Sequence, residues 1–297
     1  MAKEIKLSGN LKINNMESDK QKLKYRNFNI EGKVALVTGG ASGLGHSFVK
    51  NLLEQGIRGI TIVDINSSLG ETVCAELKKK HGNEKVIFFK ADVVDKEQFE
   101  GAFKETLATF GAIDILINNA GILNEQQWLK EISINITGTI NGILLGLEHY
   151  IQKYKSGPEG VIVNVCSVSA VGGPIPFPVP IYTCSKFAVH GLTITFGCIE
   201  HYQRTGVRIV AICPGITDTP IIDFNNFGGI FLGKPYSDLT EFYIKTHTIQ
   251  KPESCASALI QIIKKAPTGT LWISEGDQKP YQYEIPDRFS IPKVYLE

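Results

Sequence analysis

Short apolar runs alternate with longer amphipathic stretches along most of this chain. The apolar runs have the length of strands, and they lie at 34–38, 59–64, 86–92, 113–119, 161–167, 207–214 and 270–274. Between them, apolar residues recur three and four positions apart, which predicts helices at 44–55, 96–109, 125–153, 183–205 and 253–265, and another that ends at 78–80. Several strands are apolar throughout, as is typical of strands covered on both faces. The alternation predicts βαβ units and an α/β fold with a doubly wound parallel sheet flanked by helices.

Two stretches depart from this alternation. Residues 1–28 are polar and lack a hydrophobic period, so we expect a flexible extension before a single domain at 29–297. Residues 216–250 lie outside the sheet pattern and are rich in aromatic and aliphatic side chains. A long loop in a compact domain is usually a lid or a binding loop, and an apolar lid favours an apolar substrate. A peripheral helix pair packed on the body fits this stretch equally well.

Composition and charge restrict the classes of function. The net charge of +1 creates no field that would attract nucleic acid, although residues 1–28 carry seven Lys or Arg against three Asp or Glu. No apolar run approaches the roughly 20 residues that a membrane helix needs. The six cysteines form no C-x-x-C pair, so neither a metal site nor a disulfide framework is predicted. With a polar N-terminus unlike a signal peptide, we expect a cytoplasmic protein.

A glycine-rich turn, TGGASGLG at 38–45, follows the first predicted strand and leads directly into a helix. Glycines permit a tight turn and let the backbone approach a pyrophosphate. The helix that follows directs its free N–H groups and the positive end of its dipole toward the phosphates. With a strand before it and a helix after it, this turn predicts a Rossmann-type dinucleotide site.

The second predicted strand ends in an acid, Asp64, which lies 19 residues beyond Gly45. Such an acid accepts hydrogen bonds from the adenosine ribose hydroxyls and repels a 2′-phosphate. No Lys or Arg lies within 38–45 or directly after Asp64 to neutralise that phosphate. The predicted cofactor is therefore NAD rather than NADP, and the alternative role of Asp64 is that of a loop cap.

Two further strand ends reach the carboxyl edge of the sheet, where ligands bind in open α/β folds. Asp92 follows the third strand, where it could contact the adenine edge or cap the next helix. The run NNAG at 118–121 brings small residues and backbone groups to the same edge. Both positions are therefore candidates for contact with a dinucleotide.

Tyr182 and Lys186 are four residues apart near the start of a predicted helix, so they share one face. A free tyrosine titrates near ~10, and a nearby ammonium group lowers its pKa by favouring the phenolate. Such a pair can move a proton at neutral pH, as alcohol oxidation or ketone reduction requires. The spacing alone arises by chance on many surface helices, but downstream of a dinucleotide turn it indicates catalysis.

Together these motifs make the chain similar to the short-chain dehydrogenase/reductase family. The matching motifs are T-G-x-x-x-G-x-G at 38–45, N-N-A-G at 118–121, Y-x-x-x-K at 182–186 and P-G at 214–215. The resemblance covers roughly residues 31–275. Within the family, the chain most resembles the NAD-dependent 15-hydroxyprostaglandin dehydrogenases and the insect alcohol dehydrogenases.

The resemblance implies a role for each matched residue. Tyr182 would be the general acid and base, and Lys186 would hold the nicotinamide ribose and lower the tyrosine pKa. Asn135 would anchor a water in a proton relay, although a buried asparagine in a helix also needs local partners. Thr219 would contact the nicotinamide carboxamide. The implied dinucleotide-binding residues are Gly39, Ser42, Gly43, Leu44, Gly45, Asp64, Ile65, Asp92, Val93, Asn119, Ala120, Gly121, Tyr182, Lys186, Pro214, Gly215, Ile216, Thr217 and Thr219.

The catalytic serine has two candidates. The usual family spacing, 13 residues before the tyrosine, selects Ser169, whereas counting from the strand start at Gly160 selects Ser167. Sheet pairing fixes strand length while loops vary, so Ser167 is preferred and the proline-rich loop at 174–180 is expected to be two residues longer. The prostaglandin dehydrogenases have a glutamine three residues before the tyrosine. Here that position is Val179, so a polar contact with prostaglandin would be lost.

These observations predict an oxidoreductase that transfers a hydride between NAD and a secondary or allylic alcohol or its ketone. The expected substrate is apolar, of the terpenoid, steroid, prostanoid or fatty alcohol class, and the serine would stabilise its oxygen in the transition state. Three alternatives are an NADP-dependent carbonyl reductase, a sugar-nucleotide epimerase and a non-catalytic dinucleotide-binding relative. By analogy with the family, we expect a homodimer or homotetramer that packs through the helices at 125–153 and 183–205.

Overall fold

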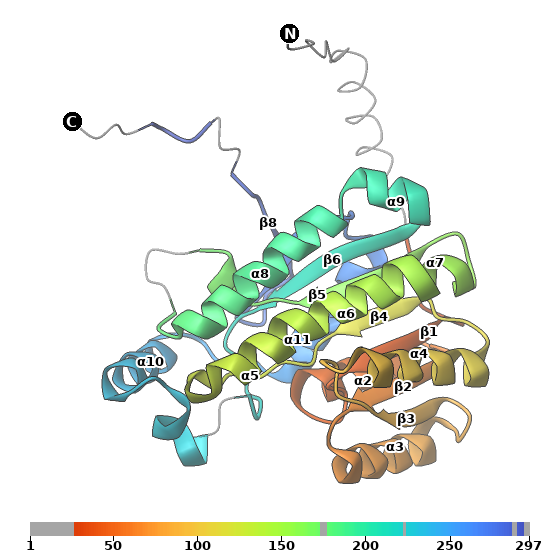
Figure 1. The fold of residues 1–297 in the computed structure, drawn as a ribbon, viewed down its shortest axis with the longest axis horizontal. Helices are drawn as coiled ribbons and strands as arrows, with labels where there is room; N and C mark the ends of the chain where they lie inside the picture. The colour runs from red at the N-terminus through yellow and green to blue at the C-terminus, as the bar shows by residue number, and fades with distance from the viewer. Residues whose placement is uncertain (1–26, 173–176, 222–223, 287–289, 294–297) are drawn as a thin grey trace.

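The computed structural model describes residues 27–172, 177–221, 224–286 and 290–293, which form one sheet with helices on both faces (Figure 1). Its strands are β1 (Val34–Thr38), β2 (Gly59–Asp64), β3 (Val86–Lys90), β4 (Ile115–Asn118), β5 (Gly160–Val165), β6 (Val207–Pro214), β7 (Leu271–Ser274) and β8 (Tyr281–Tyr283). They pair in the order β3-β2-β1-β4-β5-β6-β7-β8, in parallel except for the antiparallel pair β7–β8. The predicted doubly wound α/β fold is confirmed. The extension predicted at 1–28 lies outside the described residues except for its last two.

Successive residues of each strand alternate between two apolar layers. On β1, Ala35 and Val37 pack in the layer of α2 (Gly43–Glu54), α3 (Ser67–His81) and α11 (Pro252–Lys265). Leu36 points the other way, into the layer of α4 (Lys96–Phe110), the helical run α5–α7 and α8 (Pro180–Phe196). Figure 1 shows α8 and the α5–α7 run in front of the sheet. Because both faces are covered, the central strands are apolar throughout.

The two longest predicted helices differ in detail from the expectation. The first is a helical run of α5 (Trp128–Ile132), a π-type turn at Ser133–Gly138, α6 (Thr139–Leu144), a second π-type turn at Leu145–Tyr150 and α7 (Ile151–Tyr154). The second is divided into α8 and α9 (Ile199–Thr205) at Gly197, where an added Cβ would lie 2.6 Å from the Gly269 Cα. Within the described residues, no helix has both the length and the apolar character needed to cross a membrane.

Strand β8 was not predicted. It has only three residues, which is too short for a periodic signal, and it exists because it pairs with β7. The stretch at 216–250, for which a helix pair was one of the two expectations, contains a 3₁₀ helix at Phe224–Ile230 and α10 (Lys234–Thr246). These helices lie at one end of the molecule in Figure 1, next to the start of α8.

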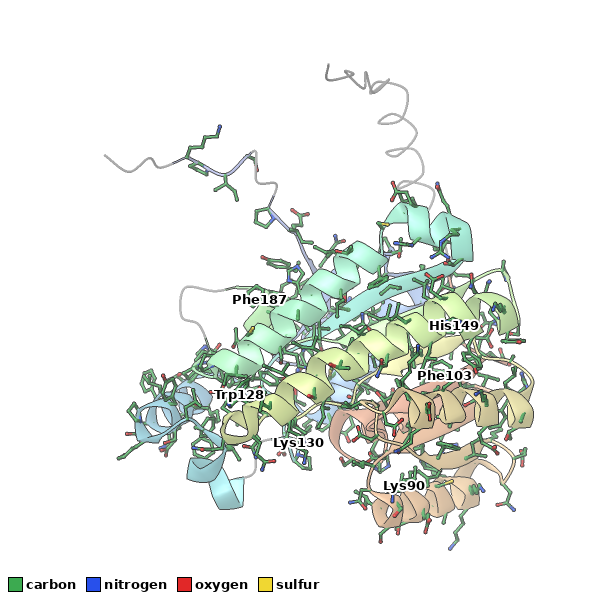
Figure 2. All side chains as sticks on the ribbon, viewed as in Figure 1. Lys90, Phe103, Trp128, Lys130, His149 and Phe187 are labelled. Atoms are coloured by element: carbon green, nitrogen blue, oxygen red, sulfur yellow. The ribbon has the colours of Figure 1, made fainter. Side chains whose placement is uncertain are left out.

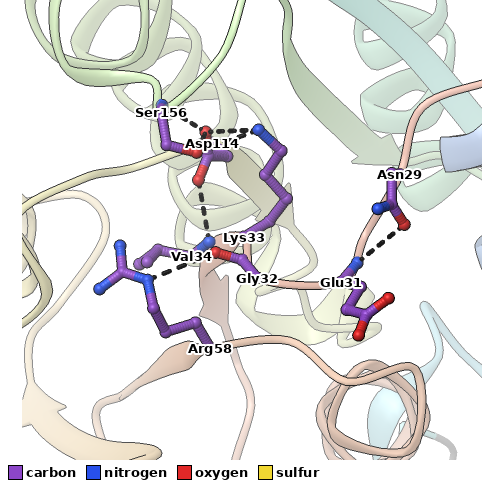
Figure 3. A network of polar contacts seen from close by, with 8 residues as sticks. All are labelled: Asn29, Glu31, Gly32, Lys33, Val34, Arg58, Asp114 and Ser156. Atoms are coloured by element: carbon purple, nitrogen blue, oxygen red, sulfur yellow. Dashed lines mark hydrogen bonds and ion pairs between the residues drawn. The ribbon is translucent and has the colours of Figure 1, made fainter.

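A buried carboxylate stabilises the amino edge of the sheet, opposite the candidate site. Asp114 is fully buried and accepts hydrogen bonds from the Val34 N–H at 3.0 Å and from the Ser156 N–H and hydroxyl at 2.6 and 2.8 Å. The Lys33 ammonium lies 3.5 Å from the same carboxylate (Figure 3). A buried carboxylate is tolerated only when hydrogen bonds replace its water. This network therefore links the start of β1 to the starts of β4 and β5.

The order of the strands reverses between β1 and β4. From β1 the chain first adds β2 and β3 on one side, and then β4, β5, β6 and β7 on the other. Such a reversal leaves a crevice at the carboxyl ends of the two central strands, where ligands bind in open α/β sheets. The candidate site is built at this point.

Candidate active site

The glycine turn between β1 and α2 has the backbone shape that its sequence requires. Gly39 and Gly43 have positive φ angles of 61° and 50°, in the left-handed region that favours glycine. A Cβ on Gly45 would lie 2.1 Å from the Gly39 carbonyl oxygen, so this glycine lets α2 pack directly on the turn. Ser42 precedes α2 and makes no side-chain hydrogen bond to its first turn. The first N–H groups of α2 therefore lack a side-chain cap, as an anion site requires.

Asp64 lies at the end of β2 beside this turn. Its Oδ2 accepts from the Ala41 N–H at 3.1 Å, and its Oδ1 accepts from the Asn66 N–H at 3.0 Å. The loop-cap role is thus present in the structure. Each carboxylate oxygen keeps a second acceptor position, and Asp64 also lines the cavity described next. Asp64 can therefore hold the turn and bind hydroxyl groups at once.

A cavity of about 580 Å³ opens at the carboxyl edge of the sheet, above the reversal of strand order. Among the predicted dinucleotide-binding residues, it is lined by Gly39, Ser42, Gly43, Leu44, Asp64, Ile65, Asp92, Val93, Asn119, Ala120, Gly121, Tyr182, Lys186, Pro214, Gly215, Ile216, Thr217 and Thr219. Gly45 is not part of the lining, because it packs behind Gly39. The fold thus brings residues from six strand ends and from α8 to one cavity.

Tyr182 and Lys186 lie in the first turns of α8 and are 8% and 4% exposed. The Lys186 Nζ lies 5.4 Å from the centroid of the Tyr182 ring and donates to the Val165 carbonyl at 2.9 Å. Burial raises the pKa of the Tyr182 phenol, the charge of Cys166 adds to this, and a hydrogen bond with the Ser167 side chain opposes it. This direction is opposite to the predicted lowering by Lys186. The reason is that the loss of solvation of the buried phenol is the largest effect on its pKa.

Ser167 follows β5, and its side chain acts on Tyr182 by lowering the pKa of the phenol. Its Oγ also accepts from the Ser169 N–H at 3.1 Å. The Ser169 hydroxyl has no hydrogen-bond partner among the described residues. Both serines line the cavity, but these contacts support Ser167 as the partner of the tyrosine. The loop at 174–180, which we expected to be longer, lies partly outside the described residues.

Asn135 lies in the first π-type turn and is 1% exposed. Its Oδ1 accepts from the Ile122 N–H at 2.9 Å, and its Nδ2 donates to the Ile122 carbonyl and to the Ser185 Oγ, both at 3.0 Å. It is not part of the cavity lining. These are the local partners that a buried asparagine needs. The role of Asn135 in holding a relay water stays a prediction.

Asn119 has a structural contribution that the sequence did not reveal. Its side-chain amide donates to the Thr38 carbonyl at 2.8 Å and to the Gly39 carbonyl at 3.2 Å, and its N–H donates to the Thr38 hydroxyl at 2.9 Å. Asn119 therefore joins the carboxyl ends of β1 and β4 and supports the glycine turn.

The outer part of the cavity is apolar. It is lined by Leu123, Phe177, Ile216, Ile221, Ile230 and Tyr243. Four of these come from the stretch at 216–250, although its opening and closing as a lid stays a prediction. Val179 is fully buried in an apolar cluster with Leu123 and Tyr182 and does not line the cavity. The position that carries glutamine in the prostaglandin dehydrogenases therefore does not face the cavity here.

Sequence reasoning missed several polar residues near the site. Lys130 on α5, labelled in Figure 2, lines the cavity, and so does Gln127, which directly precedes α5. Glu125 and Glu131 are fully buried close to Tyr182. Spacing could have revealed Glu131, because it lies four residues before Asn135 and so shares its helix face.

Comparison with protein families gives a match to the short chain dehydrogenase model over residues 33–226. The chain is 35% identical over 240 residues to 15-hydroxyprostaglandin dehydrogenase [NAD(+)] of Rattus norvegicus, covering 79% of this chain and 87% of that protein. It is 34% identical to alcohol dehydrogenase 2 of Ceratitis capitata, covering 82% of this chain and 92% of that protein.

Solved structures show the same fold. Levodione reductase superposes with a TM-score of 0.69 and 26% identity, covering 82% of this chain and 96% of the other. A short chain dehydrogenase/reductase from Burkholderia phymatum, solved in complex with NAD, superposes with a TM-score of 0.67 and 21% identity, covering 80% and 87%. The resemblance drawn from the four sequence motifs is thereby confirmed.

Proposed function

Because the chain belongs to the short chain dehydrogenase family of oxidoreductases, we propose that it transfers a hydride between NAD and an apolar secondary or allylic alcohol or its ketone. The observation that carries this proposal is the meeting of Tyr182, Ser167 and Lys186 at one cavity with the glycine turn. The outer part of that cavity is apolar, which favours an apolar substrate.

The residues around the turn fit a dinucleotide. The positive φ angles of Gly39 and Gly43 let the backbone approach a pyrophosphate, and the uncapped N–H groups of α2 can bind its oxygens. Asp64 would accept hydrogen bonds from the adenosine ribose. When bound, NAD supplies the ring that accepts or donates the hydride. The NAD-dependent relatives add support for this cofactor.

The protein side chains would handle the proton. Tyr182 would take the proton from the substrate hydroxyl during oxidation and return it to the carbonyl oxygen during reduction. The hydroxyl of Ser167, which lines the same cavity and lowers the pKa of Tyr182, would stabilise the same oxygen. Lys186 would hold the nicotinamide ribose, and its contact with Val165 positions it on the face of α8 that carries Tyr182.

The negative charge of Asp64 should decide the choice between NAD and NADP. We expect Asp64→Asn to lower the ratio of NAD to NADP affinity by about tenfold, because the charge that repels a 2′-phosphate is lost. Asparagine keeps a side-chain oxygen for the Ala41 or Asn66 N–H, so the turn can persist. Calorimetric titration with both dinucleotides measures the ratio, with the exposed Glu71→Gln as a charge-matched control. An unchanged ratio would remove Asp64 from cofactor selection.

A substrate panel tests the reaction itself. We expect turnover of at least one class among sterols, terpenoid alcohols, prostanoids and fatty alcohols, measured by NADH absorbance with NAD in excess. Larger apolar alcohols should give lower KM values than ethanol, because the outer cavity buries more of their surface. NAD binding without turnover across the panel would favour a non-catalytic relative. Turnover only with NADP would favour the carbonyl reductase alternative.

We also propose that the protein is a homodimer or homotetramer in the cytoplasm. A shallow apolar groove between the α5–α7 run and α8 is lined by Ile136, Ile140, Ala188, Gly191, Leu192, Thr195 and Phe196. These are the helices that the family resemblance assigns to subunit packing. All six cysteines lie within the described residues and are free, which suits a reducing compartment.

A further inference from the structure

Two glutamates beside the candidate site are buried in an unusual way. Glu125 and Glu131 are both 0% exposed, although glutamate is almost never fully buried unless it is paired. Each has one carboxylate oxygen that accepts backbone hydrogen bonds and one that has no partner among the described residues, Glu125 Oε2 and Glu131 Oε1. Neither forms a salt bridge in the described part of the chain. A buried acceptor left without a partner is costly, so these oxygens require an explanation.

The bonded oxygen of Glu125 caps the helix that carries the catalytic tyrosine. Helix α8 begins with Pro180, which has no N–H, and the preceding Val179 provides no side-chain cap. Glu125 Oε1 accepts from the next two N–H groups, those of Ile181 at 2.8 Å and Tyr182 at 3.2 Å. Glu125 therefore fixes the backbone of the first turn of α8, including that of Tyr182 itself.

The bonded oxygen of Glu131 holds its carboxyl group at the backbone of the residue that precedes Glu125. Glu131 Oε2 accepts from the Asn124 N–H at 2.5 Å, and Asn124 directly precedes Glu125 in the chain. Glu131 belongs to α5, which packs against α8. The charged groups that act on it are Glu125 and, from α8, Lys186. Its charge in turn acts on Tyr182.

We propose that Glu125 and Glu131 share one proton, so that the protonated carboxyl group of Glu131 donates from Oε1 to Oε2 of Glu125. The shared proton gives both unpartnered oxygens a partner and removes the repulsion between two buried negative charges. It leaves the negative charge on Glu125, where the N–H groups and the dipole of α8 stabilise it. The pair thus positions Tyr182 through the start of α8. For the catalytic consequence, the inference rests on the proposed function.

The titration of Glu131 agrees with this arrangement. Burial raises its pKa from 4.5 to about 7, and the charge of Glu125 acts in the same direction, while the Asn124 N–H and Lys186 oppose it. Below about pH 7 the pair keeps its proton. Above it, both carboxylates are charged, and their repulsion would weaken the hold of Glu125 on the first turn of α8.

The pH dependence of stability has a definite sign. In the unfolded chain Glu131 titrates near 4.5, so between pH 4.5 and about 7 the folded protein binds more protons than the unfolded one. The contribution of Glu131 to the free energy of unfolding is fully present below pH 4.5 and is lost as the pH rises to about 7. It then stays constant at higher pH.

The variant Glu131→Gln tests the pair directly. Glutamine keeps an oxygen for the Asn124 N–H and offers a permanent N–H donor to Glu125, whatever the pH. We expect the Tm of Glu131→Gln minus the Tm of the wild type to increase as the pH rises from 4.5 to 7. Above pH 7 this difference should be constant. The exposed Glu71→Gln on α3 should follow the wild type throughout. A Tm difference without this pH dependence would disprove the shared proton, whatever the protein catalyses.

Two further readouts test the positioning role. In the wild type, hydrogen-exchange protection of the Ile181 and Tyr182 N–H groups should fall as the pH rises from 6 to 8, whereas in Glu131→Gln it should not. With an alcohol that the protein oxidises, the ratio of the kcat of Glu131→Gln to that of the wild type should increase about fivefold as the pH rises, with an apparent pKa of about 7. The KM for NAD should be unchanged. Equal protection profiles in the two proteins would show that the pair does not position Tyr182. That result is independent of whether any substrate is found, so it is distinguishable from failure of the proposed function.

Discussion

We expect Tyr182→Phe to lower kcat for alcohol oxidation by about 10³-fold and to change the Kd for NAD by less than about threefold. In the proposed mechanism the phenol exchanges a proton with the substrate oxygen, and the phenyl ring of the variant keeps the packing of Leu123 and Ile230 around it. Loss of the hydroxyl therefore removes chemistry and leaves the fold and the glycine turn intact. Stopped-flow measurement of NADH formation gives kcat, and calorimetric titration gives the Kd.

The matched control is Tyr154→Phe, which removes the hydroxyl from a tyrosine that is 42% exposed and lies at the far end of the α5–α7 run. Its turnover should equal that of the wild type. Near-normal turnover by Tyr182→Phe would show that another group moves the proton.

The pH dependence of the oxidation rate gives a second check on Tyr182. Since burial raises the pKa of Tyr182, the rate of oxidation should still be increasing on the alkaline side of neutrality.

Ser167→Ala should lower kcat by about 10²-fold, and Ser169→Ala by less than about threefold. The Ser167 side chain acts on the phenol of Tyr182, so in the proposed mechanism its loss removes a donor from the place where charge develops on the substrate oxygen. The Ser169 hydroxyl does not act on Tyr182 and has no hydrogen-bond partner among the described residues. Both serines line the cavity and both substitutions remove one hydroxyl, so each variant is the control for the other. The reverse order of effects would assign catalysis to Ser169. It would also show that the family spacing before the tyrosine predicts the catalytic serine better than the distance from the start of the strand does.

Local sequence patterns were sufficient for most of the fold. Each strand predicted from an apolar run is present, because a strand covered on both faces must be apolar whatever its partners are. The glycine turn was equally predictable, since the positive φ angles at Gly39 and Gly43 are a local property of the backbone. Strand β8 escaped prediction because its three residues depend on pairing with β7.

The candidate site was only partly predictable. The chemical identities of Tyr182, Lys186 and Asp64 follow from motifs, and the structure brings all three to one cavity. The pKa of the tyrosine did not follow, because spacing along a helix says nothing of how deeply a phenol is buried or where a lysine finds its acceptor. Asn135 likewise was assigned through the family resemblance, but its contacts with Ile122 depend on how the helix packs.

The sequence by itself thus determined the α/β architecture, the glycine-rich turn and the pairing of Tyr182 with Lys186 on one helix, since each depends on residues close together in the chain. Only the tertiary structure decided which serine side chain acts on the pKa of Tyr182, which side chains line the outer cavity, and that Glu125 caps α8 from 56 residues away. The physical reason is the same in each case. Burial, charge coupling and hydrogen bonds between distant segments depend on which surfaces meet, and local periodicity does not specify that.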